Sequence, residues 1–368
     1  MTRDPDDGAR VRINPLSMTR LWILLTLVAL GAGGLAVAAS RDALPPAVER
    51  LLALPERVYT QLFPPRKGRL RQLTEMERAA FQELVRRLDA LIVWSSNRDG
   101  NHELYLMDLR SQEVRRLTRH SHVDFFSRFS PDGRQIVFLR SQREWVSFRE
   151  ESAWDVYLIS TDGSGERLLA KQGYHPTWTT DGRGIIFLRG QRVLRLDLRT
   201  GREELLLDAA RELPGVEIGD VELSADGTRL AVAVRGRFDG AAVWDLQQRA
   251  LSPLTKVQAC QTTWVPRNGG LLWVAAEGHG GTRIMRAAGA GAPGEVFMDL
   301  PGHYSHEYFP RLSNDGRWLI WGAAAEGHEH DRADYEIFLW EVGTPWEKAV
   351  RVTYYTGNDQ WPDIYVRR

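Results

Sequence analysis

The chain repeats one short motif, and this repetition limits its fold more than any other feature. In each copy an aromatic residue or leucine precedes, by three residues, an Asp-Gly pair or a substitute for it, and an apolar strand follows. Phe129, Asp132 and Gly133 form the clearest copy. The turn positions are residues 132, 181, 226, 267 and 315, separated by 49, 45, 41 and 48 residues. A period of about 40–50 residues with several strands per unit predicts a β-propeller.

Each unit is expected to contain four strands. The Asp-Gly pair suits a tight turn between the first two, because Gly accepts a positive φ and Asp bonds its own backbone. The third strand usually ends in Asp, as at Asp108 and Asp197, and a fourth strand follows a short turn. One unit departs from this pattern: Arg267-Asn268 replaces Asp-Gly, and its third strand (residues 284–286) lacks the Asp.

The two ends of the repeat region complement each other. The first unit begins at residues 91–94, which match a second strand, and it has no first strand of its own. Residues 361–366 at the C-terminus match a first strand. We therefore predict an all-β, six-bladed propeller over residues 91–368 that is closed by the C-terminal strand, so that no long edge stays unpaired.

These units resemble the TolB-type propeller repeat. Its pattern is roughly P-x-W-S-P-D-G, an apolar strand, then L-Y-x-x-D and L-T. Residues 129–133 and 104–108 fit this pattern closely, whereas Ala225 stands where Pro is expected. The resemblance covers about residues 91–368. It implies an extracytoplasmic propeller that often serves as a protein-interaction module, and it fixes no activity.

An apolar segment near the N-terminus predicts export from the cytoplasm. Residues 21–39 carry no charge, and nineteen helical residues at about 1.5 Å each span roughly 28 Å, close to a bilayer core. A slight excess of arginine before this segment favours a cytoplasmic tail (residues 1–20), a single-pass anchor in a bacterial inner membrane, and a propeller in the periplasm or outside. In the alternative, Ala-Val-Ala at residues 36–38 is a signal-peptide cleavage site and the protein is secreted.

Residues 41–90 are expected to form a short helical neck. Thr74 and Glu77 have the spacing of a capping box. Apolar residues then recur with helical spacing on one face, which predicts a helix packed on the main domain. A stalk that binds a partner or a second copy is the alternative. The residues of this stripe are Phe81, Leu84, Val85 and Leu88.

Composition excludes several classes of protein. The chain has 48 basic and 48 acidic residues, whereas a dedicated nucleic-acid binder normally has a basic excess, so no nucleic-acid partner is expected. The one cysteine, Cys260, excludes an internal disulfide and a CxxC motif, and we expect it to pack in the interior. No G-x-S-x-G nucleophile motif is present.

All histidines are predicted to lie on one rim of the ring. Turns between strands 1 and 2 and between strands 3 and 4 share one rim, and the 2–3 and inter-blade loops share the other. Every histidine falls in the second group or at the start of an inner strand, and loops on a rigid scaffold often carry function. These residues are His102, His120, His122, His175, His279, His303, His306, His328 and His330.

The last blade has the densest group of possible metal ligands. His328 and His330 form a His-x-His segment, which in an extended chain points both rings to one side, and His306 precedes them in the same unit. Imidazoles with neighbouring carboxylates suit zinc, manganese or iron. The alternative is a solvated polar loop. No other cofactor is expected, and a divalent metal here is a candidate only.

Carboxylates and one aromatic loop complete the candidate binding residues. Asp124, Glu307 and Asp359 occupy one equivalent position and are predicted to ring the channel mouth, where they would favour a cation or a basic segment. Their alternative role is to hold loop amides. The loop at residues 141–154 contains Trp145 and Arg149, residue types that are enriched at interface hot spots.

We consider two functions at this point. The first is a non-enzymatic, membrane-tethered scaffold that binds an envelope protein or peptide through the histidine rim. The second is a metal-dependent lyase or hydrolase for an acidic carbohydrate, similar in kind to oligogalacturonate lyases, with Gln261, His306, His328 and His330 as candidates. The binding residues of the first are His122, Asp124, Trp145, Arg149, His303, His306, Glu307 and Asp359.

Overall fold

The computed structural model describes residues 68–368 except residues 238, 267–268, 326–329, 332 and 368. The predicted cytoplasmic tail, the apolar segment at residues 21–39 and the first part of the neck lie outside the described residues. Within the described part of the chain, no helix has the length and apolar character that a membrane crossing requires.

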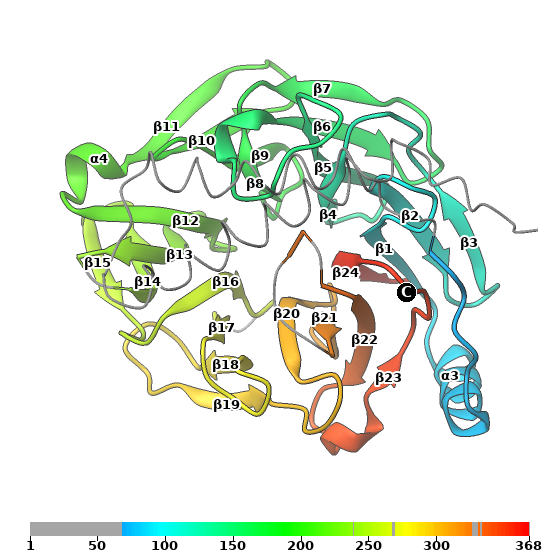
Figure 1. The fold of residues 1–368 in the computed structure, drawn as a ribbon. Coiled ribbons are helices and arrows are strands. Elements are labelled where there is room, and N and C mark those ends of the chain that lie inside the picture. The colour runs from blue at the N-terminus through cyan, green and yellow to red at the C-terminus, as the bar shows by residue number, and fades with distance from the viewer. Residues whose placement is uncertain (1–67, 238, 267–268, 326–329, 332, 368) are drawn as a thin grey trace, which may run out of the picture. The chain divides into compact units, whose positions relative to one another are not determined.

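Six four-stranded antiparallel sheets are arranged around a central axis, and each is one blade (Figure 1). From the axis outwards, the blades consist of the following strands. Blade I contains β24 (Asp359–Val366), β1 (Ala90–Ser96), β2 (Glu103–Asp108) and β3 (Glu113–Arg116); blade II contains β4 (Asp124–Phe129), β5 (Gln135–Ser141), β6 (Trp154–Ser160) and β7 (Arg167–Ala170). Blade III contains β8 (Tyr174–Trp178), β9 (Gly184–Arg189), β10 (Arg192–Asp197) and β11 (Glu203–Asp208); blade IV contains β12 (Val216–Leu223), β13 (Arg229–Gly236), β14 (Gly240–Asp245) and β15 (Ala250–Pro253). Blade V contains β16 (Ala259–Trp264), β17 (Leu271–Ala275), β18 (Arg283–Ala287) and β19 (Glu295–Met298); blade VI contains β20 (His306–Leu312), β21 (Trp318–Ala324), β22 (Tyr335–Glu341) and β23 (Val350–Arg351).

The C-terminal strand closes the ring, as the sequence predicts. Strand β24 pairs antiparallel with β1, with Ala90 opposite Val366 and Ser96 opposite Asp359. Blade I is therefore built from both ends of the propeller, and β24 occupies its innermost position (Figure 1). The prediction of six blades is confirmed.

The Asp-Gly turns share one hydrogen-bond arrangement. In blade II, Ser130 Oγ donates to Asp132 Oδ1 (2.6 Å), and the same carboxylate oxygen accepts the Arg134 amide (3.1 Å). Gly133 has φ +71° and its amide donates to the Ser130 carbonyl. Matching bonds recur at Thr179–Asp181, Ser224–Asp226 and Ser313–Asp315. The side-chain donors hold the pKa of Asp226 down at about 2, so this carboxylate stays ionised at neutral pH.

One helix of the predicted neck packs on the propeller. Helix α3 (Glu75–Arg87) begins with the predicted capping box, in which Thr74 and Glu77 bond each other's backbone amides. Its buried residue Leu84 and the following Leu88 pack into the core between blades I and VI. Short helices α4 (Ala209–Glu212), η1 (Glu151–Ala153) and η2 (Trp346–Lys348) lie in loops between strands.

We expect Gly133→Ala to destabilise the protein more than the matched change Gly227→Ala. Both glycines have nearly the same positive φ, +71° and +73°, and alanine there costs about 1–2 kcal/mol. A Cβ at Gly133 would also lie 2.4 Å from the Tyr365 ring on the closing strand, whereas a Cβ at Gly227 meets nothing within 4 Å. Overpacking of this kind adds about 1–3 kcal/mol.

Urea unfolding of the full chain measures this difference. Equal losses of stability in the two variants would mean that Tyr365 does not pack against the blade II turn.

Candidate functional site

The innermost strand of every blade is interrupted by a β-bulge near the axis. In β4 the register slips between Phe125 and Arg128, and the other five inner strands slip at or next to the matching place. In five of the six strands, one residue of the bulge other than glycine has a φ between 48° and 60°. Such a backbone costs on the order of 1–3 kcal/mol and persists only where the surrounding structure enforces it. These five residues are Phe126, His175, Gln261, Phe309 and Trp361.

Three of the bulge residues form an aromatic cluster on the axis. The ring centroid of Trp361 lies 4.8 Å from that of Phe126 and 4.1 Å from that of Phe309. The side chains of these three residues are almost fully buried. Their contacts close the central channel at this level, and the packing of the rings offsets part of the strain in the bulges.

Two loops extend over this cluster from blades on either side of blade I. Phe148, in the β5–β6 loop, lies 4.4 Å from Trp361, and His330, in the β21–β22 loop, lies 5.9 Å from it. The loops are also joined directly, because Asp331 accepts hydrogen bonds from Ser147 Oγ (2.5 Å) and from the Phe148 amide (3.1 Å). We call residues 147–148 with residues 330–331 the loop bridge.

The other two bulge residues with a positive φ, His175 and Gln261, are polar. His175 Nδ1 lies 2.8 Å from Asp220 Oδ1, and the pair is buried. Gln261 Oε1 accepts the Phe309 amide at 2.5 Å, which ties blade V to blade VI. The structure therefore uses Gln261 to hold a strained backbone amide.

A second layer lies two residues further along most inner strands, on the side of the Asp-Gly turns. It contains one residue from each blade, four positions before the turn Asp or its counterpart. We call this set the charged layer: Arg128, Thr177, Glu222, Thr263, Arg311 and Asp363. Burial and the nearby carboxylates determine the charge of each member.

Arg311 and Asp363 each have close hydrogen-bond partners, and Arg311 Nε alone of these groups has no acceptor among the described residues. Arg311 Nη1 donates to Glu222 Oε2 (2.5 Å) and to Thr263 Oγ1 (2.8 Å). The carboxylate of Asp363 accepts the amides of Phe129 (2.7 Å) and Ile364 (2.9 Å).

Arg128 differs from these residues. Its Nη1 donates to the carbonyl of the adjacent Ser127 (2.7 Å), and its guanidinium lies 4.1 Å from the Phe126 ring. No carboxylate of the described residues lies within ion-pair distance of it. Burial, and secondarily the charge of Arg311, lower the pKa of Arg128 to about 9.

The three predicted mouth carboxylates are buried and engaged within the protein. Asp124 binds Arg140 through two bonds (2.7 and 2.8 Å), and Asp359 accepts a bond from Arg98 (2.9 Å). Glu307 accepts the amide of Leu300 from the preceding loop (2.7 Å), and burial raises its pKa to about 8. The contact of Glu307 corresponds to the alternative role, that of holding a loop amide, and none of the three side chains lines an open channel mouth.

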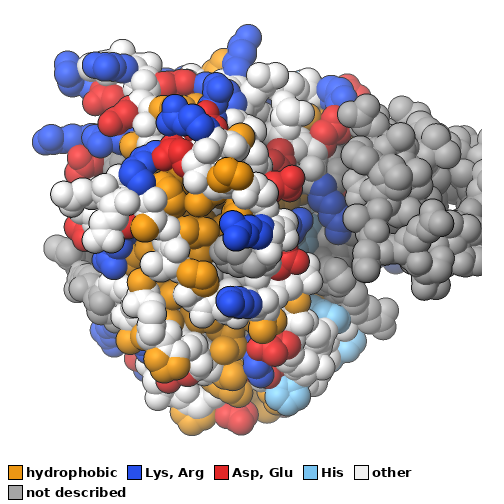
Figure 2. Space-filling model, turned by 90° about the vertical axis from the view of Figure 1, so that its left-hand side faces the viewer, with side chains coloured by type: hydrophobic (Ala, Val, Ile, Leu, Met, Phe, Trp, Pro, Cys, Tyr) orange, Lys and Arg blue, Asp and Glu red, His pale blue; other side chains and the backbone are white. Residues whose placement is uncertain are grey.

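The eight described histidines lie in the loops and strand ends of one rim, as the topology predicts. Figure 2 views the ring from its side, and the histidine side chains in that view gather towards one edge. Their environments differ: His122 Nδ1 lies 2.7 Å from the Ser141 carbonyl, His102 is buried against Phe125, and His303 is exposed beside Tyr304.

The candidate metal ligands do not form a metal site within the described chain. No group of three His, Cys, Asp or Glu side chains there is close enough to hold an ion. His330 is surrounded by aromatic rings, 4.8 Å from Tyr308 and 5.0 Å from Phe309. His306 lies at the start of β20, and His328 is outside the described residues. The proposal of a metal at these three residues thus remains a prediction.

Trp145 and Arg149 flank the loop bridge in the β5–β6 loop. Trp145 is half-buried and Arg149 is exposed. The neighbouring Arg143 pairs with Glu150 (2.6 Å), and Tyr174 Oη donates to the Phe148 carbonyl (2.5 Å). The loop is therefore held in a defined conformation at the rim.

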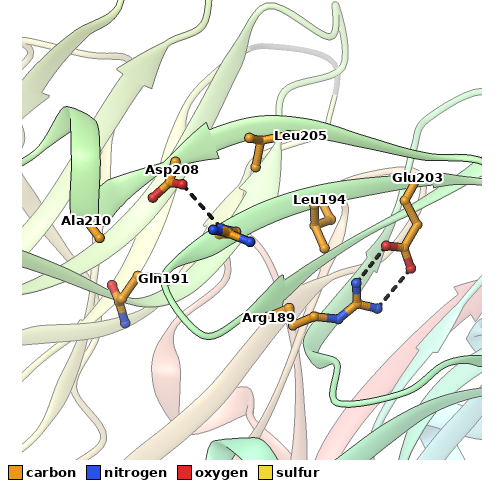
Figure 3. A pocket seen from close by; sticks show the side chains of 8 residues that line it. Arg189, Gln191, Leu194, Glu203, Leu205, Asp208 and Ala210 are labelled. Carbon is orange, nitrogen blue, oxygen red and sulfur yellow. Dashed lines mark hydrogen bonds and ion pairs between the residues drawn. The ribbon is translucent and has the colours of Figure 1, made fainter.

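A groove of about 430 Å³ lies at the outer part of blade III, away from the channel (Figure 3). Two ion pairs cross it, Arg189–Glu203 (2.6 Å) and Arg192–Asp208 (3.2 Å). Since its charges are paired and its strands are the outer ones of the blade, it has no connection to the loop bridge.

Of the bulge residues and the charged layer, only His175 and Gln261 were among the candidates predicted from the sequence. Reading across the repeats at four positions before the turn Asp would have exposed the charged layer, since Arg128, Glu222 and Arg311 stand where neighbouring strand positions are apolar or small. A positive φ at an aromatic residue has no such sequence signal.

No family model matches the chain. Solved structures show the same fold at low identity. A protein assigned as TolB from Agrobacterium tumefaciens is 14% identical, with a TM-score of 0.53 over 76% of this chain and 99% of that one. TolB from Acinetobacter baumannii is 12% identical (TM-score 0.48; 80% and 86% covered), and an oligogalacturonate lyase in complex with manganese is 16% identical (TM-score 0.45; 72% and 74% covered). The chain thus has the six-bladed propeller fold of TolB-type proteins.

Replacing the buried His102 by Phe should reduce the loss of stability on acidification. Burial lowers the pKa of His102 to about 3, while the unfolded chain binds this proton near its ordinary pKa of about 6.5. The unfolded state therefore holds more protons between these values, and stability falls as the pH drops below 6.5. At pH 5 the loss from this residue is about 2 kcal/mol.

The measurement is the difference in unfolding free energy between pH 7.5 and pH 5 in urea. We expect this difference to shrink by about 2 kcal/mol in His102→Phe and to stay unchanged in His303→Gln, which alters an exposed histidine. If both variants keep the wild-type difference in unfolding free energy between the two pH values, His102 is charged at pH 5 in the folded protein.

Proposed function

We propose that the chain is a membrane-tethered, non-enzymatic propeller of the bacterial cell envelope that binds a protein or peptide through its histidine-bearing rim. The loop bridge carries this proposal. Two loops from different blades are fixed to each other beside the aromatic cluster, so this part of the rim is preorganised for a partner. Preorganised surfaces of this kind lose little conformational entropy on binding a partner.

Residue chemistry on this rim supports a protein or peptide partner. Trp145 and Arg149 flank the loop bridge, and aromatic residues and arginine are the types that contribute most to interfaces. His122, His303 and His306 extend the same rim into the neighbouring loops. The low-identity TolB structures support the scaffold role through the fold alone.

The apolar segment at residues 21–39 supports attachment to the inner membrane with the propeller outside the cytoplasm. A tether confines the propeller near the membrane surface and raises its effective concentration towards other envelope components.

Site-specific photo-crosslinking in envelope fractions tests the rim. A photoreactive residue is placed at Trp145 or His303, and, as the matched control, at Arg183, an exposed residue in an Asp-Gly turn of the opposite rim. We expect a discrete adduct from the first two positions and none from Arg183. An adduct from Arg183 alone would move the interface away from this rim. So would an adduct at His303 that persists unchanged when Trp145→Ala and Arg149→Glu are introduced.

The enzyme alternative makes a separate prediction about metal content. Under our proposal, the purified full chain holds less than one equivalent of zinc, manganese or iron, and His306→Ala with His330→Ala leaves this content unchanged. Elemental analysis is the measurement. A stoichiometric metal that these substitutions remove would replace the scaffold by a metal-dependent enzyme.

A further inference from the structure

We propose that residues 69–78, where the neck meets the propeller, make contact with the surface of an anionic phospholipid bilayer. The contact is separate from the loop bridge and goes beyond the protein or peptide partner proposed for that rim. Only the nearness of a membrane rests on the proposed function, through its tether. Exposed apolar side chains, unpaired arginines and a rigid attachment to the ring support the contact.

Two apolar side chains of this segment are unusually exposed. Leu70 is 66% exposed and Met76 is 80% exposed, whereas the other large apolar side chains exposed on the described chain range from 38% to 47%. Single exposed apolar residues are common on a folded protein. Here the two most exposed ones fall within a stretch of seven residues. Apolar side chains of this kind gain free energy on entering the headgroup region of a bilayer.

Unpaired positive charge surrounds the two apolar residues. Arg69 and Arg78 are exposed, and neither side chain forms an ion pair with the described residues. In the sequence, Arg66 and Lys67 directly precede the described part of the chain. Glu75 is the one acidic residue of the segment without an arginine partner there, so positive charge prevails. Each basic residue near an anionic bilayer strengthens attachment by about fivefold.

Side-chain contacts fix the segment to blade VI. Arg71 donates to the buried Glu336 (2.5 Å) and to Tyr304 Oη (3.2 Å). Arg351 donates to the same Tyr304 oxygen (2.8 Å) and to Glu77 (2.5 Å). Two side chains of the segment thus meet the ring at one place. The exposed apolar residues are therefore held in a defined position and do not belong to a freely moving linker.

The backbone places the start of this segment at the histidine rim. Leu70 forms a β-bridge with Tyr355, in the loop before β24, and the Gly68 amide donates to the Arg98 carbonyl (3.0 Å) in the β1–β2 loop. Both loops belong to the histidine rim. Helix α3, which follows, lies at the periphery of the ring beside β23 (Figure 1). A bilayer that touches residues 69–78 therefore lies at the outer edge of blades I and VI.

The proposed tether makes so small a contact effective. Two apolar side chains and a few basic residues bind a bilayer weakly by themselves. Insertion of residues 21–39 of the same chain would turn this binding into an intramolecular step with a high effective concentration. The contact would then hold one side of the propeller against the membrane instead of leaving the ring to rotate on its neck.

Fluorescence quenching of the full chain in lipid nanodiscs tests the contact. A bimane label is attached at Met76→Cys or, as the matched control, at Leu205→Cys, an apolar residue that is 47% exposed on the outer strand of blade III. Both variants carry Cys260→Ser, which removes the native thiol. The discs contain phosphatidylcholine with or without phosphatidylglycerol, and a lipid with a nitroxide headgroup is the quencher. We expect quenching at position 76 in the anionic discs to be at least twice that in neutral discs or at position 205.

Charge variants separate lipid attraction from accidental proximity. In anionic discs, Arg69→Gln with Arg78→Gln should lower the equilibrium constant of the contact by roughly 25-fold, which brings quenching at position 76 down to the control value. Raising the salt concentration should act in the same direction. Arg183→Gln with Arg199→Gln removes the same charge from exposed positions on the opposite rim and should leave the quenching unchanged.

Two results would overturn the proposal. One is equal quenching at positions 76 and 205, or quenching at position 76 that depends on neither the anionic lipid nor Arg69 and Arg78. The other is a label at position 76 that is shielded from iodide in water and from the nitroxide lipid alike, because the neck of the same chain would then cover Met76.

Alkaline carbonate extraction of the envelope reports on the tether separately, since it releases surface contacts and leaves an inserted helix in place. Retention in carbonate without quenching at position 76 would keep the tether and reject the contact. Release by carbonate together with charge-dependent quenching would keep the contact and reject the tether.

Discussion

The pairing of β24 with β1 is the interaction on which the ring depends. Six twisted sheets around an axis leave one seam, and here the seam is closed by backbone hydrogen bonds between strands that are separated by more than 260 residues in sequence. The same strand supplies Trp361 to the aromatic cluster and Asp363 to the charged layer. Ring closure and the packing of the channel therefore depend on the same strand. Without β24, the aromatic cluster and the charged layer would each lose a residue.

The bulges explain how a propeller with small blades fills its axis. An uninterrupted inner strand would present alternate side chains to the two neighbouring blades only. A bulge with one residue at positive φ turns an extra side chain towards the axis. In blades I, II and VI this residue is aromatic and fills the channel. In blades III and V it is His175 or Gln261, each bound to a polar partner in the adjoining blade. The strain of each bulge is thus matched by a contact between blades.

The fold was accessible from the sequence because its signals are local and repeated. Asp132, Asp181, Asp226 and Asp315 each form the same turn from residues within five positions of one another, and Thr74 with Glu77 forms a cap in one helical turn. The prediction that the histidines share one rim needed only the alternating direction of the strands in each blade. Each of these inferences needs only short-range chemistry and the period of the repeat.

The side-chain contacts at the axis were not accessible in this way. Asp124, Glu307 and Asp359 share one position in the repeat, but their partners Arg140, the Leu300 amide and Arg98 differ in type and in distance along the chain. Phe148 and His330 lie near each other because loops from blades II and VI are joined at Asp331, and loop conformation is not periodic. Equivalence of position therefore predicted where these residues lie and not what they bind.

The two ends of the channel offer different chemistry because the aromatic cluster divides them. On the histidine side, residues of the β5–β6 and β21–β22 loops meet beside Trp361, which suits contacts spread over several residues. On the turn side, the charged layer lies between the aromatic cluster and the Asp-Gly turns, and Arg311 pairs there with Glu222. The two rims therefore offer different side chains to a partner.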